Sequence, residues 1–419
     1  MKLLVVGSGG REHAVIWKLL KDNKNLEIIC APGNGGIAEL CRCVDIKATD
    51  VEGMVNLAKS ENVDLVVVTP DDPLALGMVD ALEAEGIRAF GPNKKAAEIE
   101  SSKVFAKNMM KKYGIPTAAY ETFDSSEKAI NYIKSRNEYP TVIKADGLAL
   151  GKGVIIAKDF EEAKAAVIEI MENKKFGESG NRVVIEQYLE GVEVSVLSFT
   201  DGKTIVPMVS AKDHKRAFDG NTGPNTGGMG TISDNPFYTK EIAEKCMERI
   251  FKPTVKALNK EGRPFKGVIF FGLMISRGEP YVIEYNARFG DPETQVVLPR
   301  LNSNLLDIMN AVVDERLSEI EIKWSERTAA CVVMASGGYP EAYEKGFEIY
   351  GLDSVKGDDV IVFHAGTSIK DGKIVTSGGR VLGVTALGDS LNDALSLAYK
   401  TCEGIKFEKA FYRRDIGKI

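Results

Sequence analysis

The chain has 419 residues and a mass of 45.6 kDa, with 54 basic and 60 acidic side chains and a net charge of -6. This length exceeds what one hydrophobic core usually serves, so we expect two to four packed units. The acidic balance excludes a general attraction to nucleic acid or to an anionic membrane surface. Any site for an anionic ligand must therefore be built locally.

We expect a cytoplasmic protein without a signal peptide or a membrane span. The first apolar run breaks at Gly7, too early for a secretory segment, and no later apolar stretch reaches membrane-spanning length. The six cysteines include no Cys-x-x-Cys pair, which indicates reduced thiols, with Cys41 and Cys43 structural. Because Ile419 closely follows the last predicted unit, we expect a monofunctional chain.

The first hundred residues alternate short β-branched runs with amphipathic stretches, including 51–59 and 74–85. This alternation predicts a parallel α/β unit. A longer helix is predicted from Lys94 to Lys112, because Gly114 can stop it and Pro116 cannot continue it. We place the end of this N-terminal substrate-binding domain near residue 101.

The rest of the chain divides into two further parts. Strand, helix, hairpin, helix and strand patterns follow one another over about 120–189, which predicts a small lid. Longer strands and a helical segment around 240–261 complete a middle domain over 102–325. The residues from 326 to 419 begin a new apolar run and contain many short strands with glycine turns, so we predict a separate C-terminal α+β domain.

The first chemical signal is the turn GSGGREH at 7–13, which follows a strand and opens a helix. Its backbone N–H groups and the helix N-terminus can hold an anion. A dinucleotide fingerprint would need glycine three residues after Gly9, and Glu12 stands there instead. The nicotinamide interpretation is therefore weak, a phosphate-bearing substrate fits equally well, and a tight turn without ligand is the third interpretation.

The second signal is the glycine-rich segment KADGLALGKG at 144–153, with a lysine at each end. Backbone amides of such a loop can lie over a polyphosphate. It is not a Walker A loop, because Gly147 and Gly151 are one residue too close and no Ser or Thr follows Lys152. The alternative is a flexible hairpin with a surface lysine, but Lys144 between apolar strand neighbours favours a ligand site.

The third signal is the strand that contains Glu284, Asn286 and Arg288, which alternation places on one face. A carboxylate and an amide oxygen, completed by phosphate oxygens and water, suit Mg²⁺ bound to a nucleotide. The alternative is a solvated strand face. We predict a magnesium site at Glu284 and Asn286.

The fourth signal is the segment 213–230, where Asp213, Lys215 and Arg216 precede several glycines. It has little apolar surface to bury, so we predict irregular, mobile backbone rather than a core element. A linker is the alternative, but a long irregular segment inside a compact chain favours a functional loop.

Together these segments resemble the ATP-grasp superfamily and, within it, the phosphoribosylamine–glycine ligases (glycinamide ribonucleotide synthetases). The resemblance spans the whole chain and depends on many motifs in a fixed order. These motifs are GSGGREHA, APGNGG, FGP with SKVFAK, IKADGLALGKGV, DHKR with TGPNTGGMG, IEYNARFGDPETQ, GGYP, and FHAGT with TSGGRVL.

The resemblance implies an N-terminal doubly wound parallel sheet, an ATP-grasp core with the lid over about 120–189, and a C-terminal domain like that of biotin carboxylase. It implies ATP with Mg²⁺ or Mn²⁺ as cofactors, and ligation of glycine to 5-phosphoribosylamine in de novo purine synthesis. Glycyl phosphate would be the intermediate; glycinamide ribonucleotide, ADP and phosphate would be the products. We expect a monomer that receives phosphoribosylamine by transient channelling from an upstream amidotransferase, with no nucleic-acid or membrane partner.

The resemblance also implies roles for individual residues. The ATP phosphates would meet Lys103, Lys144, Gly147, Gly151, Lys152 and Gly153, the adenine would meet Glu186, Tyr188 and Leu189, and the ribose would meet Glu193. Glu284 and Asn286 would bind the metal, and Arg288, Asp213, Lys215 and Arg216 would face glycine and the transferring phosphoryl group. Phosphoribosylamine would be held by Gly9, Gly10, Asn34, Gly35, Asp71 and Asp291. The family usually has glutamate where Asp71 stands, so the ribosyl pocket differs in detail.

Three rival interpretations remain. Another ATP-grasp carboxylate–amine ligase would use a different acid, and the DHKR and GSGGREH motifs argue against it. A nicotinamide oxidoreductase is disfavoured by Glu12 and by the Glu284–Asn286 pair. A non-catalytic nucleotide sensor would have lost a metal ligand or a phosphate-binding lysine, and neither is lost here.

Overall fold

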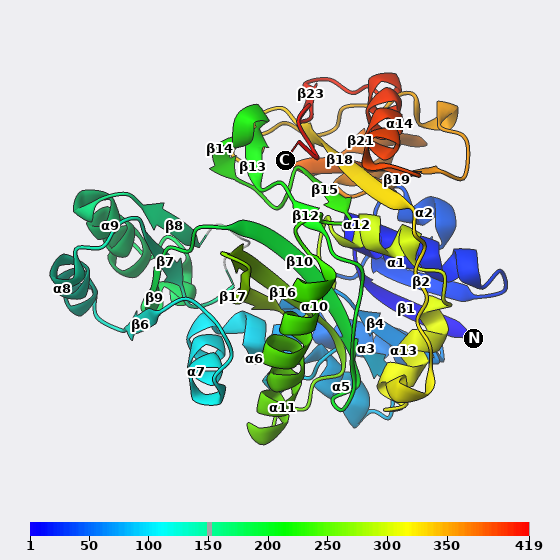
Figure 1. Cartoon of the computed structure of the whole chain (residues 1–419). Coiled ribbons are helices and arrows are strands. Elements are labelled where there is room, and N and C mark those ends of the chain that lie inside the picture. The colour runs from blue at the N-terminus through cyan, green and yellow to red at the C-terminus, as the bar shows by residue number, and fades with distance from the viewer. Residues whose placement is uncertain (149–152, 419) are drawn as a thin grey trace.

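The computed structural model describes residues 1–148 and 153–418, and Figure 1 shows how its parts are arranged. The lid, with its helices α8 and α9, projects to one side of the molecule. The N-terminal sheet, the central sheet and the C-terminal sheet pack together in the remainder. Within the described part of the chain, no helix combines the length and apolar character needed to cross a bilayer.

The N-terminal unit is a five-stranded parallel sheet with the order β3-β2-β1-β4-β5. Its central strands are buried on both faces, as parallel sheets require. The strand order reverses between β1 and β4, and the carboxyl ends of such strands form a crevice where ligands bind. The predicted doubly wound sheet is therefore confirmed. Its elements are β1 (Lys2–Gly7), α1 (Gly10–Asp22), β2 (Glu27–Pro32), α2 (Ile37–Leu40), β3 (Arg42–Cys43), α3 (Val51–Ser60), β4 (Leu65–Val68), α4 (Asp71–Leu76), α5 (Met78–Ala84) and β5 (Ala89–Phe90).

Two predicted helices are each divided. The stretch 74–85 forms α4 and α5, because Gly77 between them has a left-handed φ of 91°. The stretch from Lys94 forms α6 (Lys94–Ser101) and α7 (Lys103–Tyr113). Ser102 leaves the helical conformation, and its side chain accepts the N–H of Phe105 to cap α7. The glycine stop was predicted correctly, since Gly114 ends α7 with a φ of 69°.

The lid contains the predicted order of elements: β6 (Tyr120–Phe123), α8 (Ser126–Arg136), β7 (Thr141–Ala145), β8 (Val154–Ala157), α9 (Phe160–Val167) and β9 (Val183–Gln187). Its strands form an antiparallel sheet with the order β6-β9-β7-β8. Ile143 and Ile185 belong to the core shared with α8 and α9. Alternation therefore turns Lys144 and Glu186 to the opposite face of the sheet.

The central sheet has the order β11-β10-β16-β17, formed by β10 (Val192–Thr200), β11 (Ile205–Pro207), β16 (Gly267–Ser276) and β17 (Glu279–Asn286). One face packs against α10 (Lys240–Cys246) and α11 (Lys252–Lys260), and the other against α12 (Thr294–Val297) and α13 (Leu305–Val313). The register between β16 and β17 shifts after Gly272, which pairs with Glu284, so Ile283 is an extra residue in β17.

The C-terminal sheet takes two strands from the middle of the chain. Its order is β12-β15-β18-β22-β19, with β12 (Lys212–Asp213), β15 (Gly230–Ser233), β18 (Thr328–Ser336), β22 (Arg380–Gly388) and β19 (Val360–His364). β23 (Ala410–Phe411) pairs with β18, α14 (Leu391–Gly404) packs on the sheet, and β20 (Thr367–Lys370) pairs with β21 (Lys373–Thr376).

The prediction that 213–230 is irregular and outside any core was wrong. Beside β12 and β15, the segment forms the hairpin of β13 (Arg216–Phe218) and β14 (Thr222–Asn225). Ala217 and Met229 are fully buried. The segment needs little apolar surface of its own, because β15 pairs with the apolar strand β18.

Candidate active site

Two lysines lie where the predicted phosphate loop leaves the lid sheet. Lys144 on β7 is buried, and its Nζ donates to the carbonyl oxygen of Ile283 at 3.0 Å. Ile283 is the bulged residue of β17, so its carbonyl is free of the strand ladder. Lys103 at the start of α7 donates to the carbonyl oxygen of Gly147 at 2.9 Å, and burial lowers its pKa.

The phosphate loop itself is described only at its ends. Gly147 and Gly153 are described, and the Gly153 carbonyl accepts the N–H of Ala145 at 2.9 Å. Gly151 and Lys152 lie outside the described residues.

Glu186 on β9 lies between two buried ammonium groups. Its Oε2 is 3.1 Å from Lys144 Nζ and 3.0 Å from Lys107 Nζ. Its Oε1 is buried and has no hydrogen-bond partner among the described residues, so an acceptor remains for a donor that is not part of the protein. Lys107 was not predicted as a site residue; the signal was a lysine on the apolar side of α7, four residues after Lys103.

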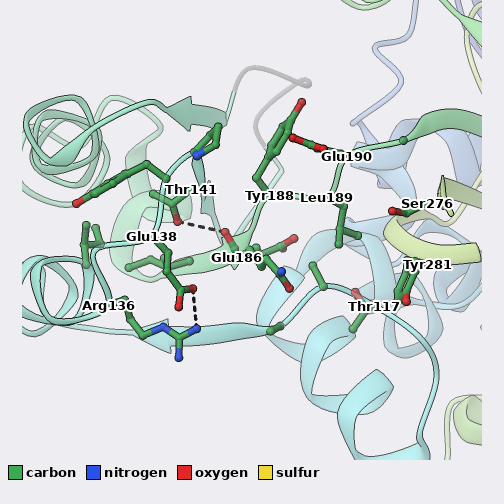
Figure 2. Close-up of a pocket in the computed structure, with 18 of the residues that line it drawn as sticks. Thr117, Arg136, Glu138, Thr141, Glu186, Tyr188, Leu189, Glu190, Ser276 and Tyr281 are labelled. Carbon is green, nitrogen blue, oxygen red and sulfur yellow. Dashed lines mark hydrogen bonds and ion pairs between the residues drawn. The ribbon is translucent and has the colours of Figure 1, made fainter.

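A cavity of about 940 Å³ lies between the hinge of the lid, formed by residues 117–119 and 187–191, and the tip of the β16–β17 hairpin. Glu186, Tyr188 and Leu189 line one side of it, and Ser276 and Tyr281 line another. Figure 2 shows Tyr188 and Leu189 projecting in different directions from the segment that follows β9. The three residues predicted to surround adenine therefore line one hollow of the size that small-molecule ligands occupy.

The predicted metal ligands lie toward the C-terminal end of β17, away from the hairpin tip. Lys215 lowers the pKa of the Glu284 carboxyl, and Lys144, Lys103 and Arg288 act in the same direction. Lys215 Nζ is 3.7 Å from Glu284 Oε1 and 3.2 Å from Glu193 Oε2. One lysine therefore contacts both the predicted metal ligand and the residue predicted to bind the ribose. An ionised carboxylate beside an amide oxygen fits a hard divalent cation.

Arg288 is close to these ligands, but the prediction that it lies on the same strand was wrong, because β17 ends at Asn286. Its Nη2 still donates to Asn286 Oδ1 at 3.1 Å and lies 3.0 Å from Glu100 Oε1. Glu100 also accepts the N–H of Ala287 at 2.7 Å through Oε2. This glutamate, from the end of α6, was not predicted, since its partners Ala287 and Arg288 lie more than 180 residues further along the chain.

Asp213 and Glu293 form a second acidic group. Burial, together with the charge of Glu293, holds the pKa of Asp213 well above its ordinary value, and burial also raises the pKa of Glu293. Asp213 Oδ1 accepts the N–H of His214 at 2.6 Å. Arg216 is placed differently: in the β13–β14 hairpin its Nη1 donates to the carbonyl of Gly223 at 2.8 Å. The guanidinium of Arg216, a predicted catalytic residue, is thus hydrogen-bonded within its own hairpin.

Glu12 explains why the first turn departs from the dinucleotide fingerprint. Its Oε2 accepts the N–H of Gly9 at 2.6 Å, and its Oε1 accepts from Thr69 Oγ1 at 2.7 Å and from Arg11 Nε at 2.6 Å. A Cβ at Gly7 would lie 2.6 Å from Glu12 Cγ. The carboxylate fills the space that a third glycine would leave open, and it ties the ends of β1 and β4 together.

The helix start at Gly10 faces Asp291. Asp291 Oδ2 accepts the N–H of Arg11 at 3.4 Å, and Arg380 Nη2 lies 3.3 Å from Asp291 Oδ1. Although burial acts the other way, Arg380 and Arg11 hold the pKa of Asp291 below its ordinary value. Asp71, at the start of α4, is half-buried and its charge acts on Arg11. Arg380, which sequence reasoning missed as a site residue, brings the C-terminal sheet to this junction.

Asn34 and Gly35 are bound by the protein itself. The Asn34 amide donates to the carbonyls of Ser8 and His364, both at 2.8 Å, and its Oδ1 accepts the N–H of Ile37 at 2.9 Å. The N–H of Gly35 donates to the carbonyl of Thr367 at 3.2 Å. These two residues therefore join the N-terminal and C-terminal units beside the crevice.

The comparisons with known proteins agree along the whole chain. The family models that match describe the N domain, the ATP-grasp (A) domain and the C domain of phosphoribosylglycinamide synthetase, over residues 1–100, 101–294 and 329–419. The phosphoribosylamine–glycine ligase of Caldanaerobacter subterraneus is 49% identical over 99% of both chains, and that of Clostridium acetobutylicum is 49% identical over 100% of both.

Solved structures give the same result. The phosphoribosylamine–glycine ligase of Thermotoga maritima superposes with a TM-score of 0.87 at 33% identity, covering 100% of both chains. The biotin carboxylase of Campylobacter jejuni has a TM-score of 0.76 at 13% identity, covering 98% of this chain and 92% of its own. That second likeness concerns the fold alone.

A doubly wound domain, a lid over a central antiparallel sheet, and lysines and acidic residues between them define an ATP-grasp protein. The family models and relatives then narrow the class: the chain belongs to the phosphoribosylglycinamide synthetase family, whose members are carbon–nitrogen ligases. The family and fold predicted from the sequence motifs are confirmed.

Proposed function

We propose that the protein joins glycine to 5-phosphoribosylamine with ATP, giving glycinamide ribonucleotide, ADP and phosphate in purine synthesis. Relatives that are named phosphoribosylamine–glycine ligase and that match over their full lengths support this activity. The observation that carries it at the site is the meeting of Lys103, Lys144, Glu284 and Arg288 between the lid and β17. Cysteines that are all free agree with a cytoplasmic location.

The nucleotide lies, in this proposal, with its adenine in the cavity beside Glu186, Tyr188 and Leu189. The unpartnered Glu186 Oε1 accepts the exocyclic amino group of adenine, and Glu193 accepts from the ribose hydroxyls. Lys103 and Lys144 bind the phosphates, together with the loop amides from Gly147 to Gly153. Gly151 and Lys152 are proposed for the same role from the resemblance alone.

Mg²⁺ or Mn²⁺ would be held by Glu284, Asn286 and phosphate oxygens. The ion neutralises phosphate charge and orients the γ-phosphoryl group when bound. The residues present fit this role, because the surrounding cations keep Glu284 ionised and Asn286 offers a second oxygen on the same strand. Lys215 and Arg288 contribute further positive charge beside the transferring group.

The reaction proceeds in two steps. A glycine carboxylate oxygen attacks the γ-phosphorus, the bond to the β,γ-bridging oxygen breaks, and glycyl phosphate and ADP form. The amine of phosphoribosylamine then attacks the acyl carbon, the C–O bond to phosphate breaks, and the proton lost from the amine ends on the released phosphate. Positioning and charge neutralisation supply most of the rate of such phosphoryl transfers.

The acid and the amine approach from different domains. Arg288 is proposed to bind the glycine carboxylate, and Asp213, with Lys215 and Arg216, to face the glycine and the phosphoryl group. The phosphoribosylamine lies at the start of α1, against Gly9, Gly10 and Asp291, with Asp71 near the ribosyl group. Asn34 and Gly35 shape this pocket through their contacts with the C-terminal unit.

The test is ADP release with Mg²⁺ and ATP, with glycine and phosphoribosylamine supplied singly and together. Phosphoribosylamine is generated in place from ribose 5-phosphate and ammonia. We expect rapid ADP release only with both substrates, and glycinamide ribonucleotide as product. Turnover that is independent of glycine, or supported equally by another amino acid, would contradict the substrate assignment and leave the ATP-grasp assignment intact.

A further inference from the structure

Lys107 is a buried lysine with no role in the proposed reaction. It lies on α7 one turn after Lys103, and its side chain is 3% exposed. Its Nζ is 3.0 Å from Glu186 Oε2 and donates to Thr117 Oγ1 at 2.7 Å. Burying an ammonium group is costly unless it is paired, so the buried Lys107 ammonium depends on the oxygens of Glu186 and Thr117.

Two buried lysines share one carboxylate oxygen of Glu186. Lys107 and Lys144 are both within 3.1 Å of the same oxygen, Glu186 Oε2, and both side chains are at most 4% exposed. One carboxylate can neutralise one ammonium group. Among the described residues Lys144 also donates to the Ile283 carbonyl, and its charge acts on Lys103 and Glu284 in the cleft. Of the two lysines, Lys144 is therefore the one that faces the side where the phosphates are proposed to bind.

The position of Lys107 is fixed by the hinge of the lid. Thr117 Oγ1, which accepts from Lys107, itself donates to the carbonyl of Val282 at 2.7 Å. The next carbonyl along β17, that of Ile283, holds Lys144. Both lysines are thus anchored to consecutive residues of one strand, with Glu186 between them.

We propose that Lys107 is a positioning residue that serves as the counterion of Glu186 and so leaves the Lys144 ammonium available to the phosphates of the nucleotide. The inference rests on the proposed nucleotide site. Without Lys107, Glu186 and Lys144 form a one-to-one ion pair. Lys144 then has to leave that pair before it can bind phosphate, and nucleotide affinity falls.

The experiment is a double-mutant cycle on the binding of Mg·ADP, measured by calorimetry on the whole chain. Lys107→Met in the wild-type background should raise the Kd about tenfold, the effect of one charge-assisted contact. In a Glu186→Gln background the same change should have almost no effect, because no carboxylate remains to hold Lys144. Lys111→Met is the matched control: Lys111 and Lys107 both lie 5.6 Å from the centre of the Tyr120 ring, and the control should bind like the wild type.

Each other outcome is decisive. An unchanged Kd for Lys107→Met overturns the inference, and an equal increase in both backgrounds shows a merely structural role and also overturns it. Thermal unfolding checks that the variants fold, and Lys107→Gln replaces Lys107→Met if the latter does not. A wild-type chain that binds no Mg·ADP would instead refute the proposed function.

Discussion

At the scale of single residues, the site depends on charged side chains, and the local sequence pattern predicts the positions of only some of them. Alternation along β17 put Glu284 and Asn286 on one face, and apolar neighbours marked Lys144 as unusual; the structure has both features. Lys107, Glu100 and Arg380 escaped notice because their partners are distant in sequence. Lys107 meets Glu186 across 79 positions, and this contact exists only once the lid has folded onto α7.

Glu284 provides the most direct test of the metal assignment. Glu284→Gln keeps the shape of the side chain but removes the charge that the neighbouring lysines and Arg288 stabilise. We expect kcat to fall by about 10²-fold or more, and the Mn²⁺ concentration for half-activation to rise. Asn286→Asp keeps an oxygen ligand and should stay within about tenfold of wild-type kcat. Full activity of Glu284→Gln would refute the assignment.

Glu12 is predicted to be structural rather than catalytic. Glu12→Gly restores the dinucleotide fingerprint but removes the acceptor for Gly9, Thr69 and Arg11. We expect the free energy of unfolding to fall by about 2–4 kcal/mol, because the buried guanidinium of Arg11 loses the carboxylate that accepts from its Nε. Urea denaturation measures this loss.

The control for Glu12 is Glu52→Gly, in the exposed first turn of α3. It should cost only about 1 kcal/mol, the ordinary penalty for glycine in a helix. Equal losses in the two variants would show that the Glu12 contacts contribute nothing beyond helix propensity. Binding of NAD by Glu12→Gly would contradict the view that the crevice is shaped for another ligand.

At the scale of elements, glycine and capping residues decided where the sequence predictions succeeded. Gly114 ended α7 where expected, but Gly77 and Ser102 each divided a helix that apolar periodicity alone made continuous. The segment 213–230 was misread for a different reason. Its strand β15 is stabilised by pairing with β18, about a hundred residues later, and no local pattern reports such a partner.

The start of α1 is an element whose close packing can be tested. A Cβ at Gly10 would lie 2.5 Å from Gln295 Nε2 on α12, so Gly10→Ala must displace Gln295, which donates to Asp291 at 2.8 Å. We expect the KM for phosphoribosylamine to rise about tenfold while the KM for ATP stays near its wild-type value. Gly404→Ala in α14 has its nearest neighbour at 3.9 Å and should leave both constants unchanged. A rise in the KM for ATP alone would place the phosphoribosylamine site elsewhere.

At the scale of the whole molecule, the crevice is closed by contacts between units that are far apart in sequence. His13 on α1 accepts the N–H of His364 on β19 through Nδ1 at 2.8 Å, and their rings are 5.5 Å apart. Burial lowers the pKa of His13 to about 3 and that of His364 to about 4. Burial likewise lowers the pKa of His214, beside β15, to about 4.

These three histidines predict a loss of stability in acid. Their native pKa values lie below the unfolded value of about 6.5, so between pH 6.5 and about pH 4 the unfolded chain binds protons that the native chain does not. Stability therefore falls as the pH is lowered through that window, by about 2 kcal/mol for each histidine at pH 5 relative to pH 8. The raised pKa values of Asp213 and Glu293 oppose this trend, because these carboxyls take up protons in the native state.

Comparison of variants separates the two contributions. In His13→Gln, the decrease in the free energy of unfolding between pH 8 and pH 5 should be smaller by about 2 kcal/mol, because the carboxyl contribution is the same in both proteins. Denaturant unfolding at several pH values measures the slope, and the absolute stability of the variant does not enter it. An identical slope in His13→Gln and the wild type would mean that His13 is protonated in the native state. The α1–β19 contact would then have to open without unfolding the rest of the molecule.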